Sequence, residues 1–83
     1  MLHAVKIEPE YFNKIIEGKK TYEIRKNDMD YVAGDCIALN EYKRGEYTGR
    51  FILTGIVSID EYPLYLDTGY VILQLSPLGL KIT

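Results

Sequence analysis

The sequence predicts a mainly β fold of the α+β class, a small β-barrel of five to six strands with one early α-helix. Three observations predict it. A segment with helix punctuation at both ends comes early, strand-like segments fill most of the remainder, and a glycine interrupts the longest of these. A glycine inside a strand is typical of a bulge or bend where a sheet curls. We expect the helix to cover one end of the barrel, and residues 1–83 to form a single domain.

The early helix is predicted within residues 9–20, with punctuation at both ends. Pro9 suits the first helical position, Glu10 lies at the positive end of the helix dipole, and Gly18 can take the left-handed conformation that ends a helix. Large apolar side chains recur on neighbouring turns and form one stripe, made of Tyr11, Phe12, Ile15 and Ile16. We expect this stripe to face the core.

Two short alternating segments, residues 3–7 and 21–26, are predicted strands on either side of the helix. In the second segment, Tyr22 and Ile24 point to one face. The opposite face carries polar side chains, namely Thr21, Glu23 and Arg25. The chain therefore leaves the helix through a strand with one apolar and one polar face.

Glycines and apolar runs divide the rest of the chain. In chain order we expect a turn at 31–35, a strand at 36–42, a hairpin loop at 43–49, a strand at 50–59, an irregular loop at 60–69 and a strand at 70–76. Gly55 lies inside the longest strand and predicts a bulge or bend there. The segment 70–76 is almost wholly apolar, which indicates a central strand. The tail 77–83 is either an edge strand or irregular.

Composition excludes several classes of protein. The 47% hydrophobic and 27% charged fractions are those of a soluble globular protein. No apolar run approaches the ~20 residues that span a bilayer, and the N-terminus lacks a secretory signal pattern, so we expect a cytoplasmic protein without membrane contact. Cys36 and His3 are the only residues of their kinds, which excludes an internal disulfide and a closed zinc site. We expect no metal and no cofactor.

The net charge of −2 is unevenly distributed along the chain. Residues 1–26 hold six cations against four acids, whereas residues 27–83 hold four cations against eight acids. Domains that coat nucleic acid are generally basic, so the overall balance argues against that role. A local positive patch in the first third of the chain remains suited to an anionic ligand.

Residues 17–28 form the most polar stretch of the chain, and the stretch admits two interpretations. Lys20, where the helix gives way to the strand, is either a solvated lysine or a phosphate contact or base that reaches into a cleft. Glu23 and Arg25 share one face of the strand, either as a surface ion pair or as part of a site. In a site, Arg25 would offer its planar fork to a phosphate or carbonyl oxygen, and Glu23 would accept from a base or sugar donor.

Four further residues are candidate ligand contacts. Gly18 ends the helix and could also let a ligand approach the backbone. Asn27 and Asp28 are typical turn residues that could add hydrogen bonds along the wall of a cleft. Tyr42, which flanks the hairpin loop together with Tyr47, could stack on an unpaired base.

The run from Gly18 to Arg25 resembles the GxKxxExR signature of ASCH domains, the activating signal cointegrator homology domains of the PUA-like superfamily. Its four defined positions are occupied by Gly18, Lys20, Glu23 and Arg25. The resemblance extends from His3 to about Ser76 and includes one small bacterial and phage branch of that superfamily. It implies a PUA-like mixed-strand β-barrel with an early helix. It also implies a module that binds RNA, a nucleotide or a modified nucleoside in a cleft beside the motif.

One bacterial ASCH branch is an amidohydrolase that removes the acetyl group from acetylated cytidine, which supplies a second hypothesis. The lysine of that branch matches Lys20, which would act as the base. Glu23 stands at the position of its threonine, and only Gln74 is available for its glutamate. Arg25 would stabilise the oxyanion, while Glu23 or Thr21 would take the remaining role.

A third hypothesis, a protein-interaction module, rests on the acidic C-terminal half of the chain and on the loop sequence EYPLYL. The three hypotheses make different demands on the motif. The binding module requires Lys20, Glu23 and Arg25 to converge on one hollow, and the hydrolase also requires a nucleophile there. The interaction module requires neither.

Overall fold

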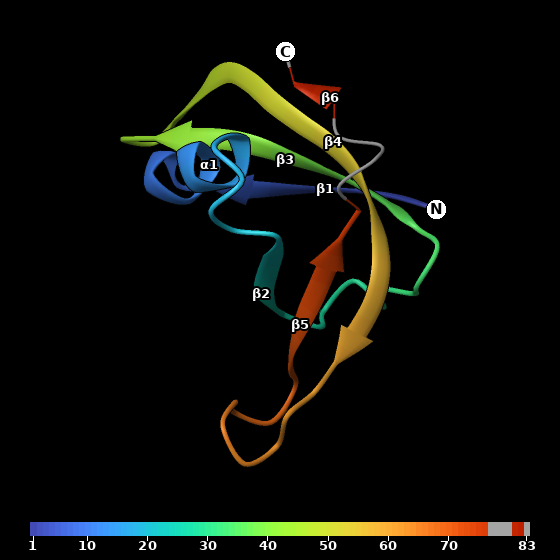
Figure 1. The fold of residues 1–83 in the computed structure, drawn as a ribbon. Helices are drawn as coiled ribbons and strands as arrows, with labels where there is room; N and C mark the ends of the chain where they lie inside the picture. Colours follow the sequence, from blue (N-terminus) through green and yellow to red (C-terminus); the bar gives the residue numbers. More distant parts are fainter. Residues whose placement is uncertain (77–80, 83) are drawn as a thin grey trace.

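The chain folds into β-strands and one short helix, as the sequence predicts (Figure 1). A computed structural model describes residues 1–76 and the backbone of residues 81–82. The elements are β1 (Leu2–Ile7), α1 (Pro9–Ile16), β2 (Tyr22–Lys26), β3 (Cys36–Lys43), β4 (Glu46–Asp60), β5 (Tyr70–Leu75) and β6 (Lys81–Ile82). β6 falls in the predicted tail, whose residues 77–80 and 83 lie outside the described residues. No helix in the described ranges is long and apolar enough to cross a bilayer.

The strands form one mixed sheet in the order β1-β3-β4-β5-β2, with β6 paired to β4. β1 is parallel to β3, and the other pairs are antiparallel. Within the described residues β1 and β2 each pair on one edge and not with each other, so the sheet is not closed. Instead of a ladder, a side chain links these edges: Arg25 Nη1 donates to the Lys6 carbonyl at 2.9 Å. The predicted barrel is therefore not confirmed, whereas the mainly β class with one helix is.

β4 is long enough to pair with β3 along its first part and with β5 along its second part, besides its short pairing with β6. Its first part pairs with β3 as far as Gly55, and its second part pairs with β5 from Ile56 onward. The register shifts between Ile56 and Ser58, so the predicted irregularity lies next to Gly55. Figure 1 shows β4 curving from the part of the sheet that holds β1 and β3 to the part that holds β2 and β5. This curvature brings β2 near the end of β1.

Helix α1 ends where predicted, and its end directs the chain into β2. Gly18 has φ +76°, and its N–H donates to the Ile15 carbonyl at 3.1 Å. The N–H of Lys19 donates to the Lys14 carbonyl at 2.9 Å. The two bonds form a Schellman motif, in which a glycine takes the left-handed conformation. Lys20 is thereby placed at the entry to β2.

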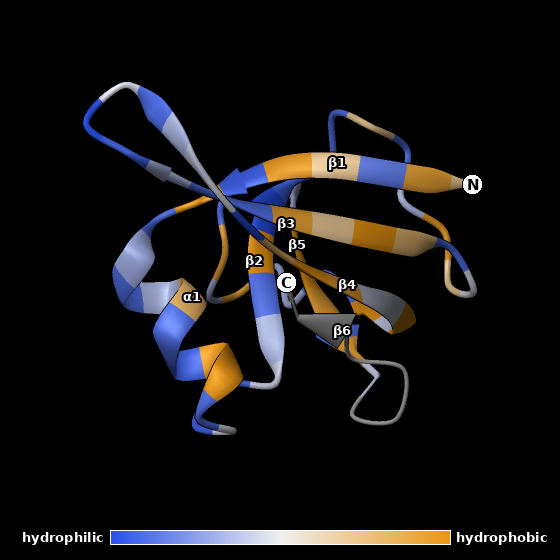
Figure 2. Ribbon diagram, turned by 90° about the horizontal axis from the view of Figure 1, so that it is seen from above, coloured by the Kyte–Doolittle hydropathy of each residue, from blue (hydrophilic) through white to orange (hydrophobic). Residues whose placement is uncertain are grey.

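The hydrophobic core draws on β1, β3, β4, β5 and α1 and on Tyr31 of the segment between β2 and β3, but not on β2 itself. Its buried members are Val5, Ile7, Phe12, Ile15, Tyr31, Ile37, Leu39, Ile52, Ile56, Val71, Leu73 and Leu75. Figure 2 shows apolar segments along β1, β3 and β4. In β2, by contrast, Tyr22 and Ile24 are 40% and 46% exposed, and Glu23 is buried. The polar face of this strand therefore turns inward and its apolar face turns outward.

The β3–β4 hairpin is longer, and its loop shorter, than predicted. Only Arg44 and Gly45 form the turn, with φ of +50° and +84°, and the rest of the predicted loop 43–49 continues the two strands. Two consecutive residues with positive φ are typical of a type I′ turn, whose twist matches that of paired strands. The pairing therefore runs close to the hydrophilic tip seen in Figure 2, with Tyr42 opposite Tyr47.

Arg50, which is paired with the buried carboxylate of Glu41, links this hairpin to α1. Glu41 is 4% exposed and accepts hydrogen bonds from Arg50 Nε at 2.9 Å, Arg50 Nη2 at 2.7 Å and Thr48 Oγ1 at 2.6 Å. Arg50 Nη2 also donates to Asn13 Oδ1 at 3.2 Å, and its guanidinium lies 4.5 Å from the centroid of the Phe12 ring. The bonds from Arg50, followed by that from Thr48, lower the pKa of Glu41 from 4.5 to about 2.

This carboxylate should make the stability of the fold sensitive to acid. Because the pKa of Glu41 is lower in the folded chain, its ionised form stabilises the fold above its ordinary pKa of 4.5, and this stabilisation is lost as the pH falls toward about 2. The pKa of Asp35 is also lowered, from 3.8 to about 2, chiefly by its hydrogen bond with His3. Protonation of Asp35 at low pH therefore also reduces the stability of the fold. We expect the free energy of unfolding, measured by urea denaturation, to fall between about pH 5 and pH 2. Glu41→Gln should show a shallower fall, and an unchanged slope would contradict this account.

Candidate ligand-binding cleft

A cleft of about 590 Å³ lies where the open sheet leaves β1 and β2 apart. One wall is the whole of β2, residues 22–26. The other wall is formed by residues 6–8 at the end of β1 and by Tyr11 of α1, and Lys20 and Tyr70 complete the lining. We call this hollow the β1–β2 cleft. It occupies the position at which a closed barrel would have a ladder between these two strands.

The charged side chains of the motif meet in this cleft. Glu23 is 6% exposed, and its partner on β5 is the fully buried Leu73, so its carboxylate lies on the inner face of the sheet. Lys20 Nζ donates to Glu23 Oε1 at 2.5 Å, and Arg25 Nη1 donates to Glu23 Oε2 at 3.1 Å. The side chains of Lys20 and Arg25 remain 13% and 27% exposed. One buried carboxylate thus holds two cations side by side at the surface of the cleft.

The cleft carries positive charge, although the chain is acidic overall. Its cations are Lys6, Lys20, Arg25 and Lys26, and its acids are Glu8 and Glu23. Because Lys20 and Arg25 share the single carboxylate of Glu23, their cluster keeps one positive charge. A positive surplus in a concave site concentrates anions. The arrangement is therefore suited to a phosphate or another anionic group.

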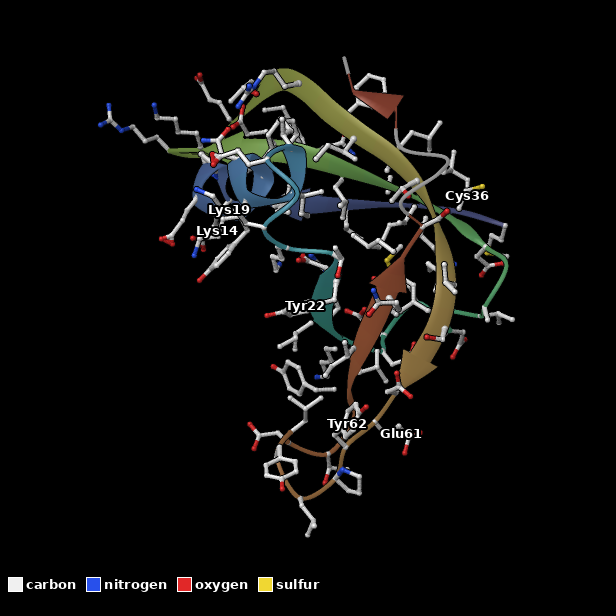
Figure 3. The ribbon with its side chains drawn as sticks, in the orientation of Figure 1. Lys14, Lys19, Tyr22, Cys36, Glu61 and Tyr62 are labelled. Atoms are coloured by element: carbon white, nitrogen blue, oxygen red, sulfur yellow. The ribbon has the colours of Figure 1, made fainter. Side chains whose placement is uncertain are left out.

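Aromatic rings flank the cations. Lys20 Nζ lies 4.9 Å from the ring centroid of Tyr11 and 5.5 Å from that of Tyr22. Tyr11, Tyr22 and Tyr70 are each about 40% exposed. Figure 3 shows Tyr22 on β2, on the same side of the molecule as Lys14 and Lys19 at the end of α1. The cleft therefore offers flat apolar surfaces beside its positive charge.

The sequence missed these three rings as ligand contacts. Tyr11 belongs to the apolar stripe of the helix, which was expected to face the core, and Tyr22 lies on the apolar face of its strand. One signal in the sequence could have indicated these ligand contacts: Tyr11 and Tyr22 lie in the helix and the strand that adjoin the motif. Which face of β2 turns outward follows from the burial of Glu23, and the strand pattern alone does not specify it.

The other predicted contacts lie elsewhere. Gly18 ends α1 and does not line the cleft. Asn27 Oδ1 accepts the N–H of Tyr31 at 3.0 Å, which is a turn contact, and Asp28 is exposed outside the cleft. Tyr42 does not line it either, but packs against the ring of Tyr47 at 5.0 Å. Of the predicted ligand contacts, the structure brings Lys20, Glu23 and Arg25 together and leaves these four apart.

Thr21 and Gln74, the other two residues considered for hydrolysis, do not line the cleft. Gln74 Nε2 donates to the Thr21 carbonyl at 3.1 Å and to Thr21 Oγ1 at 3.2 Å. Thr21 lines a different hollow, beneath the end of α1, and Gln74 lies on the outer face opposite Tyr22. Thr21 Oγ1 therefore accepts a hydrogen bond from Gln74, and Thr21 does not line the cleft that holds the Lys20–Glu23–Arg25 cluster.

A second polar cluster lies away from the cleft. Asp35 Oδ1 accepts from the N-terminal amine at 3.0 Å, and its Oδ2 lies 2.8 Å from His3 Nε2. His3 is 3% exposed and packs edge-on against Tyr31, with ring centroids 4.8 Å apart. These contacts tie the start of β1 to the turn before β3. Across the described part of the chain, no three His, Cys, Asp or Glu side chains gather as a metal site requires.

Loss of the buried carboxylate should destabilise the fold. Glu23→Gln leaves the cations of Lys20 and Arg25 beside a neutral amide, and we expect the free energy of unfolding to fall by about 1–3 kcal/mol. Glu17 is the matched control, because its pair with Lys19, at 2.9 Å, has side chains 50% and 69% exposed. Exposed pairs contribute about 0–1 kcal/mol. Urea denaturation of Glu23→Gln and Glu17→Gln measures both effects, and equal losses would show that burial of Glu23 is energetically unimportant.

Comparison with known proteins gives two matches. Residues 2–75 match the model of a family described as "Domain of unknown function (DUF3850)". The chain is also 35% identical over 86 residues to a protein of Escherichia phage P2, described as "Uncharacterized 12.9 kDa protein in GpA 3'region". That alignment covers 98% of this chain and 78% of the phage protein. The matched residues include both walls of the β1–β2 cleft.

Proposed function

Because the chain belongs to the family described as "Domain of unknown function (DUF3850)", whose description assigns no activity, we propose its function from the cleft itself. The β1–β2 cleft binds RNA or a nucleotide-like ligand through its phosphate and its base. The observation that carries the proposal is the Lys20–Glu23–Arg25 cluster, which presents two ordered cations in a hollow. The resemblance of the motif to ASCH domains points to the same class of ligand.

The dimensions and chemistry of the cleft support this ligand class. Its volume of about 590 Å³ lies within the range of about 300–1,000 Å³ that is usual for small-molecule sites. Lys20 and Arg25 can hold a phosphate, the lysine as a point charge and the arginine through its planar fork. The exposed rings of Tyr11 and Tyr22 offer stacking surfaces for a base beside these cations.

Glu23 is a positioning residue in this proposal. Both of its carboxylate oxygens already accept hydrogen bonds, one from Lys20 and one from Arg25. It therefore sets the positions of the two cations before a ligand arrives, in place of the base or sugar contact expected from the sequence. Prior ordering of this kind raises affinity because fewer side chains lose freedom on binding.

Removal of either cation should weaken binding. We expect Lys20→Ala and Arg25→Ala each to lower the affinity for a single-stranded ten-nucleotide RNA about tenfold or more, as for the loss of a charged hydrogen bond. Fluorescence anisotropy at several salt concentrations measures this, and the salt slope should shrink by about one unit per lost phosphate contact. Lys19→Ala is the control, because Lys19 pairs with Glu17 and does not line the cleft. An equal loss in Lys19→Ala would indicate general charge attraction and contradict the site.

Removal of a cleft ring should weaken binding without changing the salt slope. Tyr11→Leu keeps a good helix former but removes the flat ring, and stacking on one base contributes about 1–3 kcal/mol. Tyr62→Leu is the control, because Tyr62 lies in the β4–β5 loop, is 50% exposed and does not line the cleft (Figure 3). Tyr42→Leu tests the stacking residue that the sequence favoured, and we expect RNA affinity to be retained. If Tyr42→Leu loses RNA affinity while Tyr11→Leu retains it, the base stacks at the hairpin and not in the cleft, which contradicts this part of the proposal.

A further inference from the structure

The free edge of β2 supplies main-chain hydrogen bonds that no side chain of the cleft provides. The free-edge groups belong to Tyr22, Ile24 and Lys26, and we propose that the N–H and C=O of the central residue, Ile24, bind the Watson–Crick edge of an unpaired base. This inference rests on the proposed function and names the part of the ligand that gives specificity. The ligand class is thereby narrowed to a nucleotide, or single-stranded RNA, whose base edge is not already paired.

The hydrogen bonds at both ends of β2 show which backbone groups face the cleft. The N–H of Leu75 donates to the Thr21 carbonyl at 2.9 Å, and the N–H of Asn27 donates to the Gly69 carbonyl at 2.7 Å. Both bonds fit the antiparallel register of β2 with β5, in which Glu23 pairs with Leu73. Backbone groups alternate between the two edges of a strand. Odd-numbered residues of β2 therefore bond to β5, and the even-numbered residues point to the other edge.

That other edge has no strand beside it. β2 is the last strand in the sheet order, and every one of residues 22–26 lines the cleft. Among the described residues, the N–H and C=O groups that Tyr22, Ile24 and Lys26 turn to this edge have no hydrogen-bond partner. The cleft wall thus presents alternating donors and acceptors, which a base edge can match with its own neighbouring donor and acceptor.

Two features of the cleft favour a base as the ligand over an added peptide strand. Arg25 Nη1 donates to the Lys6 carbonyl at 2.9 Å and so crosses the cleft from β2 to β1. A peptide strand running along β2 would have to break this crossing, whereas a base can lie to one side of it. The inward charges of Glu23 and Arg25 are also a device by which edge strands resist added strands. Both oxygens of Glu23 already accept hydrogen bonds, and the main chain of β2 supplies further acceptors beside the phosphate-binding cations.

Ile24→Pro tests the inference by removing a single backbone donor from the free edge of β2. Proline removes the N–H of residue 24 from the free edge, and proline is tolerated on an edge strand when its missing N–H faces away from the sheet. The Ile24 side chain is 46% exposed, so its replacement leaves the core intact. Ile72→Val is the control, because Ile72 is the β5 partner of Ile24 and does not line the cleft.

The probes are the four ribonucleoside 5′-monophosphates and ribose 5-phosphate, titrated calorimetrically. We expect the unaltered chain and Ile72→Val to bind at least one nucleotide more tightly than ribose 5-phosphate. In Ile24→Pro that preference should shrink by about 3- to 10-fold, the loss of one hydrogen bond, with ribose 5-phosphate affinity unchanged. A preference that persists in Ile24→Pro, or an equal loss for ribose 5-phosphate, overturns the inference and leaves the proposed function standing.

A second measurement does not depend on the folding of Ile24→Pro. The nucleotide that the unaltered chain binds most tightly is compared with its form methylated on the Watson–Crick edge. Weaker binding of the methylated nucleotide, by a similar factor, supports the inference, and equal binding overturns it. If the unaltered chain binds neither nucleotides nor single-stranded RNA, the proposed function itself fails, and this inference fails with it.

Discussion

The buried carboxylate of Glu23 is the constraint on which the candidate site depends. A carboxylate that is 6% exposed must be paired, because removing a charge from water without compensation is costly. Its partners come from Lys20 and Arg25, three residues before it and two residues after it. The strand places Arg25 on the same face, and the turn that ends α1 delivers Lys20 to the entry of β2. Two cations are thereby held in the cleft before any ligand arrives.

The open sheet forms the cleft into which that cluster points its cations. β4 pairs first with β3 and then with β5, and this change of partner carries β2 toward the end of β1 without a ladder between them. A closed barrel would have used the outer edge of β2 for hydrogen bonds to β1. The structure instead leaves that edge along a cleft that is spanned by the contact of Arg25 with Lys6. The proposed ligand would use both features, the cations for its phosphate and the strand edge for its base.

Local patterns predicted several of the local features correctly. Pro9 and Gly18 marked the start and end of the helix, because a fixed φ and a left-handed φ are properties of single residues. The irregularity next to Gly55 and the alternation of residues 22–26 also followed from the pattern. The hairpin loop was predicted too long, because the turn is formed by Arg44 and Gly45 alone, and a positive φ at a residue other than glycine is uncommon. The outward face of β2 was not predictable, since either face of an alternating strand can be buried.

By itself the sequence determined the mainly β class, the helix and its end, and the spacing that lets Lys20, Glu23 and Arg25 meet. Each of these depends on backbone geometry over a few neighbouring residues. Only the tertiary structure decided that the sheet stays open, that Tyr11 rather than Tyr42 lines the cleft, and that Glu41 is paired with Arg50. These outcomes depend on which strands lie side by side, and that choice is made by the packing of the whole core.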